Sequence, residues 1–274
     1  MCLLAISYTR TRARTQDVGL HVDNCLGGFY LSFLQRAGVF KRAFDFQVPG
    51  VTTMSIDIHK YGFASKGASV VAFRNNTLRR LTYFPITDGP TLYVTPTLQG
   101  ARSGATMASA WATLLHMGED GYARAFEKLD GIFKAVCAAV RKTDGLQLLV
   151  DSQLAIVPIS SSDPSLDIYT VASEMGKRGW NMFTSAGPPA MSFCVGEQHH
   201  DLIEDWSKDL AESVAFIRAN PGTKPEGDAA IYGTAEVLPT EILDSVVRSY
   251  LDVKLSVRPS NADGNSKAAS PAPQ

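Results

Sequence analysis

Residues 51–73 read VTTMSIDIHKYGFASKGASVVAF, and this stretch decides how the rest of the chain is interpreted. Two apolar, β-branched runs, residues 54–59 and 68–73, flank a loop that carries Lys60, Gly62, Lys66 and Gly67. Such runs are typical of strands, and glycine and serine are typical of the turn between them. We therefore expect a hairpin, with Lys60 at the end of its first strand.

A second polar strand end lies upstream of this hairpin. Residues 19–24, GLHVDN, predict a short buried strand that ends at Asp23 and is followed by a double glycine and a helix. Further along, we expect extended segments at 81–88 and 91–98, a buried helix at 104–118 and an amphipathic helix at 121–143. The second half alternates expected strands (146–150, 154–160, 180–185, 190–196) with expected helices (166–179, 199–220, 234–255), which is typical of a small α/β domain.

Composition excludes several classes of function. The 274 residues are 45% hydrophobic and 19% charged, with a net charge of −1, so a basic nucleic-acid-binding surface is not expected. The four cysteines are scattered and predict neither a disulfide framework nor a metal site. This pattern favours a reducing, cytosol-facing compartment.

The two polar strand ends suggest a chemistry. Ligands of open α/β sheets gather at the carboxyl ends of the strands. There, a lysine (Lys60) and an acid (Asp23) suit pyridoxal 5'-phosphate (PLP), because the lysine can bind the aldehyde and the acid can pair with the ring nitrogen. Spacing alone leaves two simpler alternatives open. Lys60 can be a solvated surface charge, and Asp23 can cap the following helix.

Four segments carry a family resemblance: HVDNCLGGF (21–29), VPGVTTMSIDIHKYGFASKGASVVAF (48–73), YVTPTLQGARSGA (93–105) and GWNMFTSAGPP (179–189). Together they resemble the sphingosine-1-phosphate lyase family, which belongs to the group II PLP-dependent decarboxylases. The resemblance implies an α/β PLP-dependent transferase fold (aspartate aminotransferase-like, fold type I). It divides the chain into an atypical leader (1–18), a partial PLP-binding large domain (19–122), a small α/β C-terminal domain (123–257) and a disordered tail (258–274).

The same resemblance implies roles for catalytic residues. Lys60 matches the Schiff-base lysine and Asp23 matches the partner of the pyridine nitrogen. His59 matches a position beside the cofactor. Lys66 matches a lysine that holds the substrate's phosphate or steers proton transfer. Because an amine must be neutral to attack an aldehyde, we expect burial and nearby positive charge to lower the pKa of Lys60.

Three further positions match cofactor-binding residues of the family. His21 matches a position beside the cofactor. Gly100 and Ser103 match a loop that, in dimers of this family, caps the cofactor phosphate of the neighbouring subunit. The resemblance therefore predicts PLP as cofactor, a homodimer as assembly, and no metal site.

The implied reaction is PLP-dependent cleavage of a carbon–carbon bond in phosphorylated long-chain bases, which yields a fatty aldehyde and phosphoethanolamine in sphingolipid catabolism. Two alternatives stay open: an amino-acid decarboxylase, and a non-catalytic fragment that binds an intact lyase subunit. The family has a long region before the HVD strand, so we expect this chain to be an N-terminally truncated lyase. Eukaryotic members reach the endoplasmic reticulum through an N-terminal anchor, so without one we expect this chain to be cytoplasmic.

Overall fold

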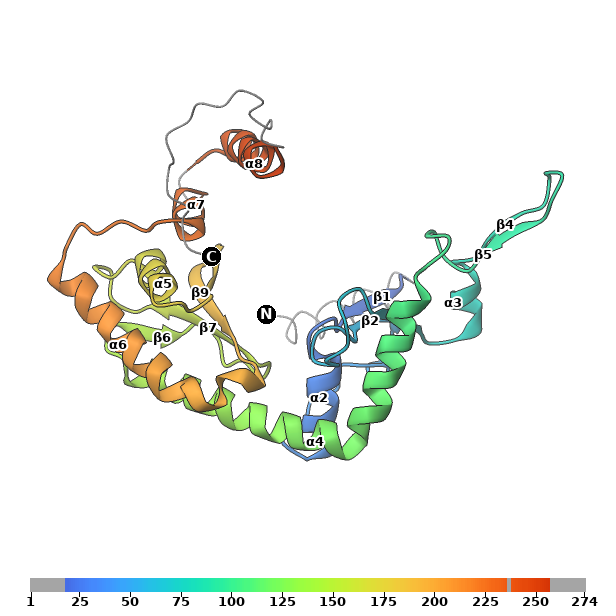
Figure 1. Cartoon of the computed structure of the whole chain (residues 1–274), viewed down its shortest axis with the longest axis horizontal. Helices are drawn as coiled ribbons and strands as arrows, with labels where there is room; N and C mark the ends of the chain where they lie inside the picture. The colour runs from blue at the N-terminus through green and yellow to red at the C-terminus, as the bar shows by residue number, and fades with distance from the viewer. Residues whose placement is uncertain (1–17, 236–237, 257–274) are drawn as a thin grey trace, which may run out of the picture.

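The structure is a computed structural model that describes residues 18–235 and 238–256. Two sheet-containing bodies are joined by one long, bent helix, α4 (Gly104–Lys142), as Figure 1 shows. Nearly all of the predicted leader (1–18) and the whole predicted tail (258–274) lie outside the described residues.

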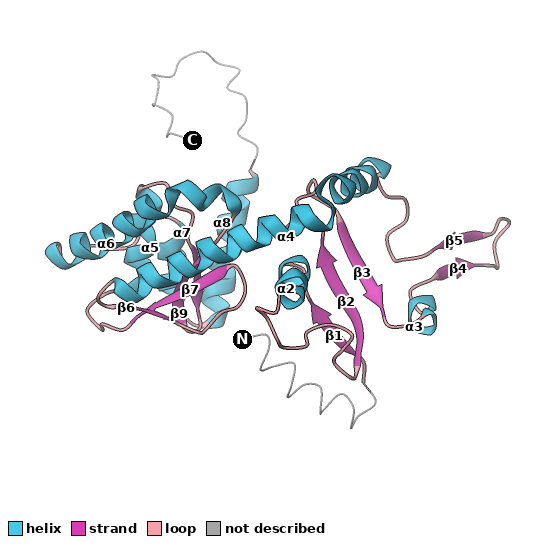
Figure 2. Cartoon of the chain, turned by 90° about the horizontal axis from the view of Figure 1, so that it is seen from below, coloured by secondary structure: helices cyan, strands magenta, loops and turns pink. Residues whose placement is uncertain are grey.

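The N-terminal body contains a three-stranded sheet in the order β1-β2-β3 (Leu20–Asp23, Val51–Asp57 and Ser69–Phe73). β1 runs parallel to β2, and β3 runs antiparallel to it. Helix α2 (Gly27–Arg36) connects β1 to the loop that leads into β2 (Figure 2). The predicted hairpin is therefore confirmed as the β2–β3 pair, with Asp57 directly opposite Ser69.

The two faces of this sheet differ in chemistry, as the alternation of strand side chains requires. One face is apolar, and its side chains form a hydrophobic cluster that includes Leu20, Val22, Met54 and Ile56. Helix α2 lies against this face, since a Cβ on Gly28 would come within 2.9 Å of Ile56 Cγ2. The opposite face carries the alternate, polar positions: His21, Asp23, Thr53, Ser55 and Asp57.

A projecting arm follows the sheet. It contains the short helix α3 (Asn76–Arg80) and the two-stranded hairpin β4 (Phe84–Ile86) and β5 (Tyr93–Thr95), which extends from the body in Figure 2. The extended segments predicted at 81–88 and 91–98 are thus confirmed. Large apolar side chains of this arm are exposed, among them Leu92 at 81% and Val94 at 74%.

Helix α4 bends at Gly118, which has φ 57° and ψ 179°, a backbone conformation that favours glycine. The prediction of a buried helix at 104–118 is wrong. Trp111 is 66% and Leu115 is 63% exposed, because this arm of α4 packs on the chain through a narrow contact at Ala110. An apolar helix sequence predicts burial, but the tertiary structure decides whether other residues pack against that helix.

The C-terminal body contains an antiparallel sheet in the order β6-β7-β9-β8 (Leu146–Leu148, Ile156–Ser161, Pro189–Cys194, Phe183–Ala186). Helices α5 (Ile168–Lys177), α6 (Ile203–Ala219) and α7 (Asp228–Ala235) and the short η1 (Glu197–Leu202) complete it, and α8 (Thr240–Leu255) follows them in the chain. The strands and helices expected in this half are confirmed in kind: α8 is the helix expected at 234–255, and α7 is a further helix that the sequence analysis did not expect. Over the part of the chain that the structure describes, no helix has the length and apolarity that a bilayer crossing requires.

One apolar core extends across both bodies. The second arm of α4 supplies Phe126, which meets Tyr30 of α2 edge to face, and Val136 and Val140, which belong to the same core. The predicted domain boundary at 122–123 falls inside this helix. The loop after Lys60 also joins the bodies, since the buried hydroxyl of Tyr61 donates to the carbonyls of Ala155 (3.2 Å) and Val195 (2.8 Å).

Replacing Tyr61 with phenylalanine is expected to lower the free energy of unfolding by about 1–3 kcal/mol, because the buried Val195 carbonyl loses its donor. Urea denaturation measures this loss. Tyr83→Phe is the control, since Tyr83 is 42% exposed, and it is expected to change the stability by less than about 0.5 kcal/mol. If Tyr61→Phe and Tyr83→Phe lower the free energy of unfolding equally, the Tyr61 hydroxyl does not stabilise the contact between the two bodies.

Candidate active site

The candidate site lies on the polar face of the N-terminal sheet, where β1 and β2 end. Because the two strands are parallel and Asp23 is paired with Ser55, their carboxyl ends meet at one edge. Asp57 ends β2 on the same face, and Lys60 follows in the turn. The structure therefore brings together the acid and the lysine that the sequence analysis singled out.

Asp23 is held as a carboxylate. Its Oδ1 accepts hydrogen bonds from the Cys25 amide (3.0 Å) and from the Ser55 hydroxyl (2.8 Å). These bonds, the first one foremost, lower the pKa of Asp23, and the nearby charge of Lys60 adds a smaller effect in the same direction. Asp23 therefore bonds to a backbone amide of the turn that leads into α2, whose assigned N-cap residue, Leu26, makes no side-chain cap hydrogen bond.

Lys60 is held as an ammonium. Its Nζ lies 2.9 Å from Asp57 Oδ2, and its side chain is 31% exposed. Hydrogen bonds to the Cys25 side chain and then to Asp57 raise the pKa of Lys60 above its ordinary value. The expectation of a lowered pKa is therefore wrong, because a carboxylate and a thiol, rather than positive charges, surround the amine.

His59 fastens the turn to the neighbouring strand. Its Nδ1 lies 2.7 Å from the Ala68 carbonyl, so this nitrogen carries the hydrogen and donates it. Its Nε2 lies 3.7 Å from Asp57 Oδ2, on the carboxylate that also contacts Lys60. His59 is thus linked to Lys60 through Asp57.

His21 is linked to Asp23 in a similar way. Its Nδ1 lies 2.8 Å from Thr53 Oγ1, and its Nε2 lies 3.3 Å from Ser55 Oγ. Since the Ser55 hydroxyl donates its hydrogen to Asp23, the Nε2 of His21 is the donor toward Ser55. A chain of donors therefore runs from His21 through Ser55 to the Asp23 carboxylate.

Three predicted site residues are not part of this hydrogen-bonded group in the portion of the chain that the structure describes. Within the described residues, Lys66, Gly100 and Ser103 are exposed and form no hydrogen bond with Asp23 or Lys60. Ser103 instead lines a groove of about 580 Å³ between the β2–β3 turn and the first arm of α4, together with Ser69.

Three residues of the site were missed by the sequence analysis as partners: Ser55, Cys25 and Ser69. Ser55 could have been found from strand alternation, because it occupies the polar face of β2 at the level of Asp23. Cys25 follows Asp23 in sequence, but its proximity to Lys60 depends on the parallel pairing of β1 and β2. Ser69 depends on the register of the hairpin in the same way.

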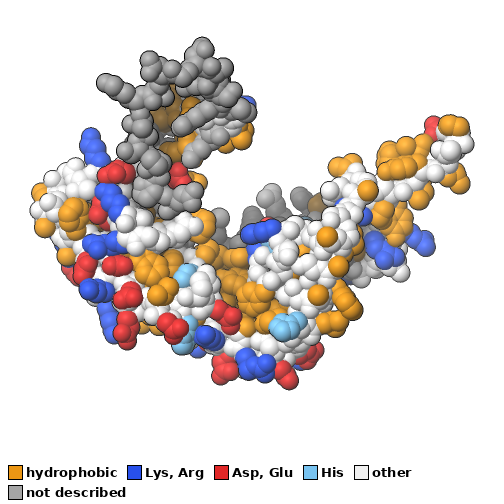
Figure 3. Space-filling view, in the orientation of Figure 1, with side chains coloured by type: hydrophobic (Ala, Val, Ile, Leu, Met, Phe, Trp, Pro, Cys, Tyr) orange, Lys and Arg blue, Asp and Glu red, His pale blue; other side chains and the backbone are white. Residues whose placement is uncertain are grey.

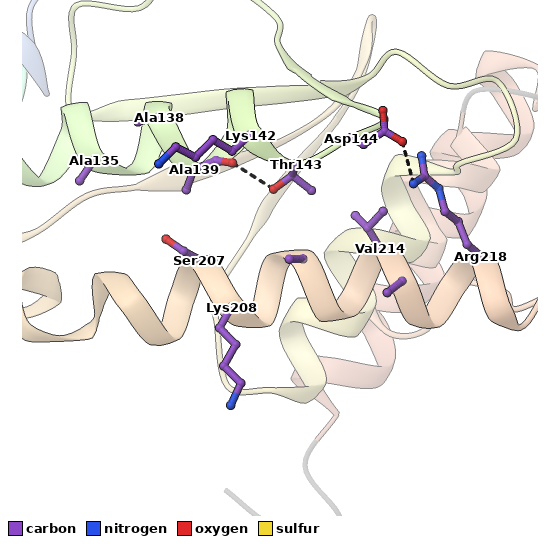
Figure 4. Close-up of a pocket in the computed structure, with 12 residues that line it drawn as sticks. Ala135, Ala138, Ala139, Lys142, Thr143, Asp144, Ser207, Lys208, Val214 and Arg218 are labelled. Atoms are coloured by element: carbon purple, nitrogen blue, oxygen red, sulfur yellow. Dashed lines mark hydrogen bonds and ion pairs between the residues drawn. The ribbon is translucent and has the colours of Figure 1, made fainter.

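A second groove, of about 600 Å³, lies between α4 and α6 and is shown in Figure 4. Ala135 and Ala139 line it on the α4 side, and Ser207 and Val214 line it on the α6 side. At one end, Arg218 pairs with Asp144 at 2.9 Å. None of the candidate catalytic residues lines this groove, so it is separate from the site.

Comparisons with known proteins place the chain in a family. It is 36% identical over 251 residues to the sphingosine-1-phosphate lyase of Arabidopsis thaliana, covering 91% of this chain and 44% of that protein. It is 35% identical over 246 residues to the sphingosine-1-phosphate lyase of Dictyostelium discoideum, covering 88% of this chain and 45% of that protein. Over the part that it spans, the chain belongs to the sphingosine-1-phosphate lyase family. No family model matches it.

Solved structures agree with this placement. The sphingosine-1-phosphate lyase of Burkholderia pseudomallei has a TM-score of 0.79 at 31% identity, over 92% of this chain and 53% of that one. Lactobacillus brevis glutamate decarboxylase, at 19% identity and a TM-score of 0.64, shares the fold. The predicted fold type I of PLP-dependent enzymes is therefore confirmed. The chain spans about half the length of the curated lyases that it matches.

Ser55→Ala is expected to raise the pKa of Asp23 toward its ordinary value, because the carboxylate loses one donor. A lowered pKa contributes stability above the unfolded-state pKa of about 3.9, and this contribution is lost as the pH falls through the folded-state value. The variant should therefore be less stable than the wild type at pH 7, by about 0.5 kcal/mol because Asp23 is exposed. This loss of stability should become smaller below about pH 4. Urea denaturation at pH 7 and at about pH 3 measures it.

The control is the same substitution in an Asp23→Asn background. There the amide does not titrate, so the effect of Ser55→Ala should be the same at pH 7 and pH 3. A pH-dependent difference that persists in this background would assign the titration to another group.

Proposed function

We propose that the protein is a PLP-dependent aldehyde lyase that cleaves phosphorylated long-chain bases, such as sphingosine 1-phosphate, to a fatty aldehyde and phosphoethanolamine. The observation that supports this proposal is the placement of Asp23 and Lys60 at adjacent strand ends on one face of a sheet. The amino-acid decarboxylase alternative has less support, because the glutamate decarboxylase neighbour shares only 19% identity and shows the fold alone.

The residues at this edge fit PLP. Asp23 is a carboxylate with a lowered pKa, which suits a cationic ring nitrogen. Lys60 is 31% exposed, so its amine can reach an aldehyde presented at the sheet edge. When bound, PLP supplies an electron-accepting ring that stabilises negative charge on the substrate carbon next to the amine.

The chain's own residues then have distinct tasks. Asp23, supported by Ser55 and Cys25, would pair with the ring nitrogen and keep it protonated. Lys60 would hold the cofactor, and His21 and His59 would flank it. Lys66 is exposed in the same loop and would reach the substrate phosphate or steer a proton.

We also propose that the protein acts as a homodimer, with the Gly100–Ser103 loop reaching the partner's cofactor phosphate. The exposed apolar side chains of the arm support a protein partner on this side (Figure 3). The cytosol-facing location, and the endoplasmic reticulum membrane for full-length members, stay predictions.

Purified chain mixed with PLP is expected to develop a new visible absorption band, which borohydride reduction fixes covalently on Lys60. Mass spectrometry of the reduced protein locates the attachment. Lys60→Ala should abolish the band, and Asp23→Asn should reduce cofactor affinity by about tenfold or more, because a charged hydrogen-bonding partner is lost. Lys41→Ala, an exposed lysine in the loop before β2, is the control and should leave the band unchanged.

Substrate class is tested separately. A phosphorylated long-chain base and an aromatic amino acid are supplied in parallel, and fatty aldehyde and carbon dioxide are measured. Aldehyde release supports the lyase, whereas carbon dioxide release supports the decarboxylase. PLP attachment to a residue other than Lys60 would overturn the site assignment. If the chain alone shows no band and carries no PLP on Lys60 after reduction, but co-purifies with an intact lyase subunit, the fragment alternative is supported.

A further inference from the structure

The carboxylate of Asp57 is the most constrained charged group beside the candidate lysine. Its side chain is only 14% exposed, although it is the last residue of its strand, at the start of the turn that carries Lys60. The Ser69 hydroxyl donates to Oδ1, while Oδ2 faces Lys60 Nζ at 2.9 Å and His59 Nε2 at 3.7 Å. The carboxylate is therefore contacted from the neighbouring strand and from its own turn.

Hydrogen bonds also hold the backbone of Asp57 in place. Its amide donates to the Cys25 carbonyl (3.2 Å), and its carbonyl accepts from the Lys60 amide (3.2 Å). Burial alone would raise the pKa of Asp57, but the hydrogen bonds from Ser69 and Lys60 lower it below its ordinary value. Asp57 is thus an ionised group in a fixed position that requires a cation beside it.

Lys60 is the cation that meets this requirement. A lysine carries a long, flexible side chain, and one without a partner samples many rotamers in solvent. The contact with Asp57 restricts the amine to the polar face that also carries Asp23. The charged or titratable groups around the Lys60 amine are Asp57 from its own turn, Cys25 and Asp23 from the end of β1, and His59 through Asp57.

We propose that Asp57, oriented by Ser69, is a positioning residue that holds the free Lys60 amine at the sheet edge and sets its charge. This inference rests on the proposed function for its catalytic meaning, since Lys60 is the residue that would bind PLP. In that setting, Asp57 retains the amine in reach of the cofactor whenever the lysine is free. It also sets the pH range in which the amine becomes neutral enough to attack the aldehyde.

The test measures the amine directly and needs no cofactor. Trace labelling with acetic anhydride, read by mass spectrometry between pH 7 and pH 11, gives the reactivity of Lys60 relative to that of Lys66 in the same sample. In Asp57→Asn, Lys60 labelling relative to Lys66 at pH 8 is expected to rise about threefold, because a partly exposed ion pair is removed. Ser69→Ala should cause a smaller rise, because Asp57 keeps its charge but loses its orienting donor.

Asp130→Asn is the matched control. Asp130 is also 14% exposed and pairs with a lysine, Lys134, on α4. This variant should leave the Lys60-to-Lys66 ratio unchanged. An unchanged ratio in an Asp57→Asn variant whose circular dichroism matches the wild type would overturn the proposal. If Asp57→Asn does not fold, Ser69→Ala decides: a rise supports the proposal, and no change overturns it.

A second measurement separates this inference from the proposed function. The pH dependence of borohydride-fixed PLP attachment to Lys60 should move to lower pH in Asp57→Asn and stay unchanged in Asp130→Asn. A merely structural role for Asp57 would lower the yield without moving the pH profile. If PLP attaches to neither the wild type nor the variant, the proposed function of this chain fails, while the labelling result still decides whether Asp57 sets the charge of Lys60.

Discussion

The parallel pairing of β1 with β2 is the constraint on which the site depends. A parallel pair brings two carboxyl ends to one edge, and the register places Asp23 beside Ser55 on a face that Asp57 also shares. A shift of the register by one residue would turn Asp57 and Ser55 toward the apolar face. The buried residues of the other face, among them Val22 and Met54, oppose such a shift because it would expose them.

At the carboxyl ends of β1 and β2, hydrogen bonds and an ion pair connect the polar side chains into one group. Cys25 links the two halves of that group, since its amide binds Asp23 and its side chain and carbonyl contact Lys60 and the Asp57 amide. A carboxylate therefore lies at each end of the site: Asp57 pairs with Lys60, and Asp23 is the carboxylate that we propose pairs with the ring nitrogen of PLP. Tyr61 then ties the same loop to the second body, so the position of the lysine is coupled to the sheet of β7 and β9.

Exposed apolar side chains gather on the arm, on the first part of α4 and on α8. Trp111 and Val94 are examples of side chains that would gain stability from burial. The chain spans about half the length of its curated relatives.

The sequence by itself determined the hairpin, the polar strand ends, the order of strands and helices, and the family, because these depend on local side-chain periodicity and on motifs of neighbouring residues. It singled out Asp23 and Lys60 as a pair, and the structure has Asp23 at the end of β1 and Lys60 in the turn after the neighbouring β2. Only the tertiary structure decided the partners of that pair. Ser55, Asp57 and Ser69 become neighbours through strand register, and the raised pKa of Lys60 follows from contacts with Cys25 and Asp57. The electrostatic interaction between two groups depends on the distance between them in space and not on their separation along the chain. The pKa of Lys60 could therefore not be predicted from the order of the residues.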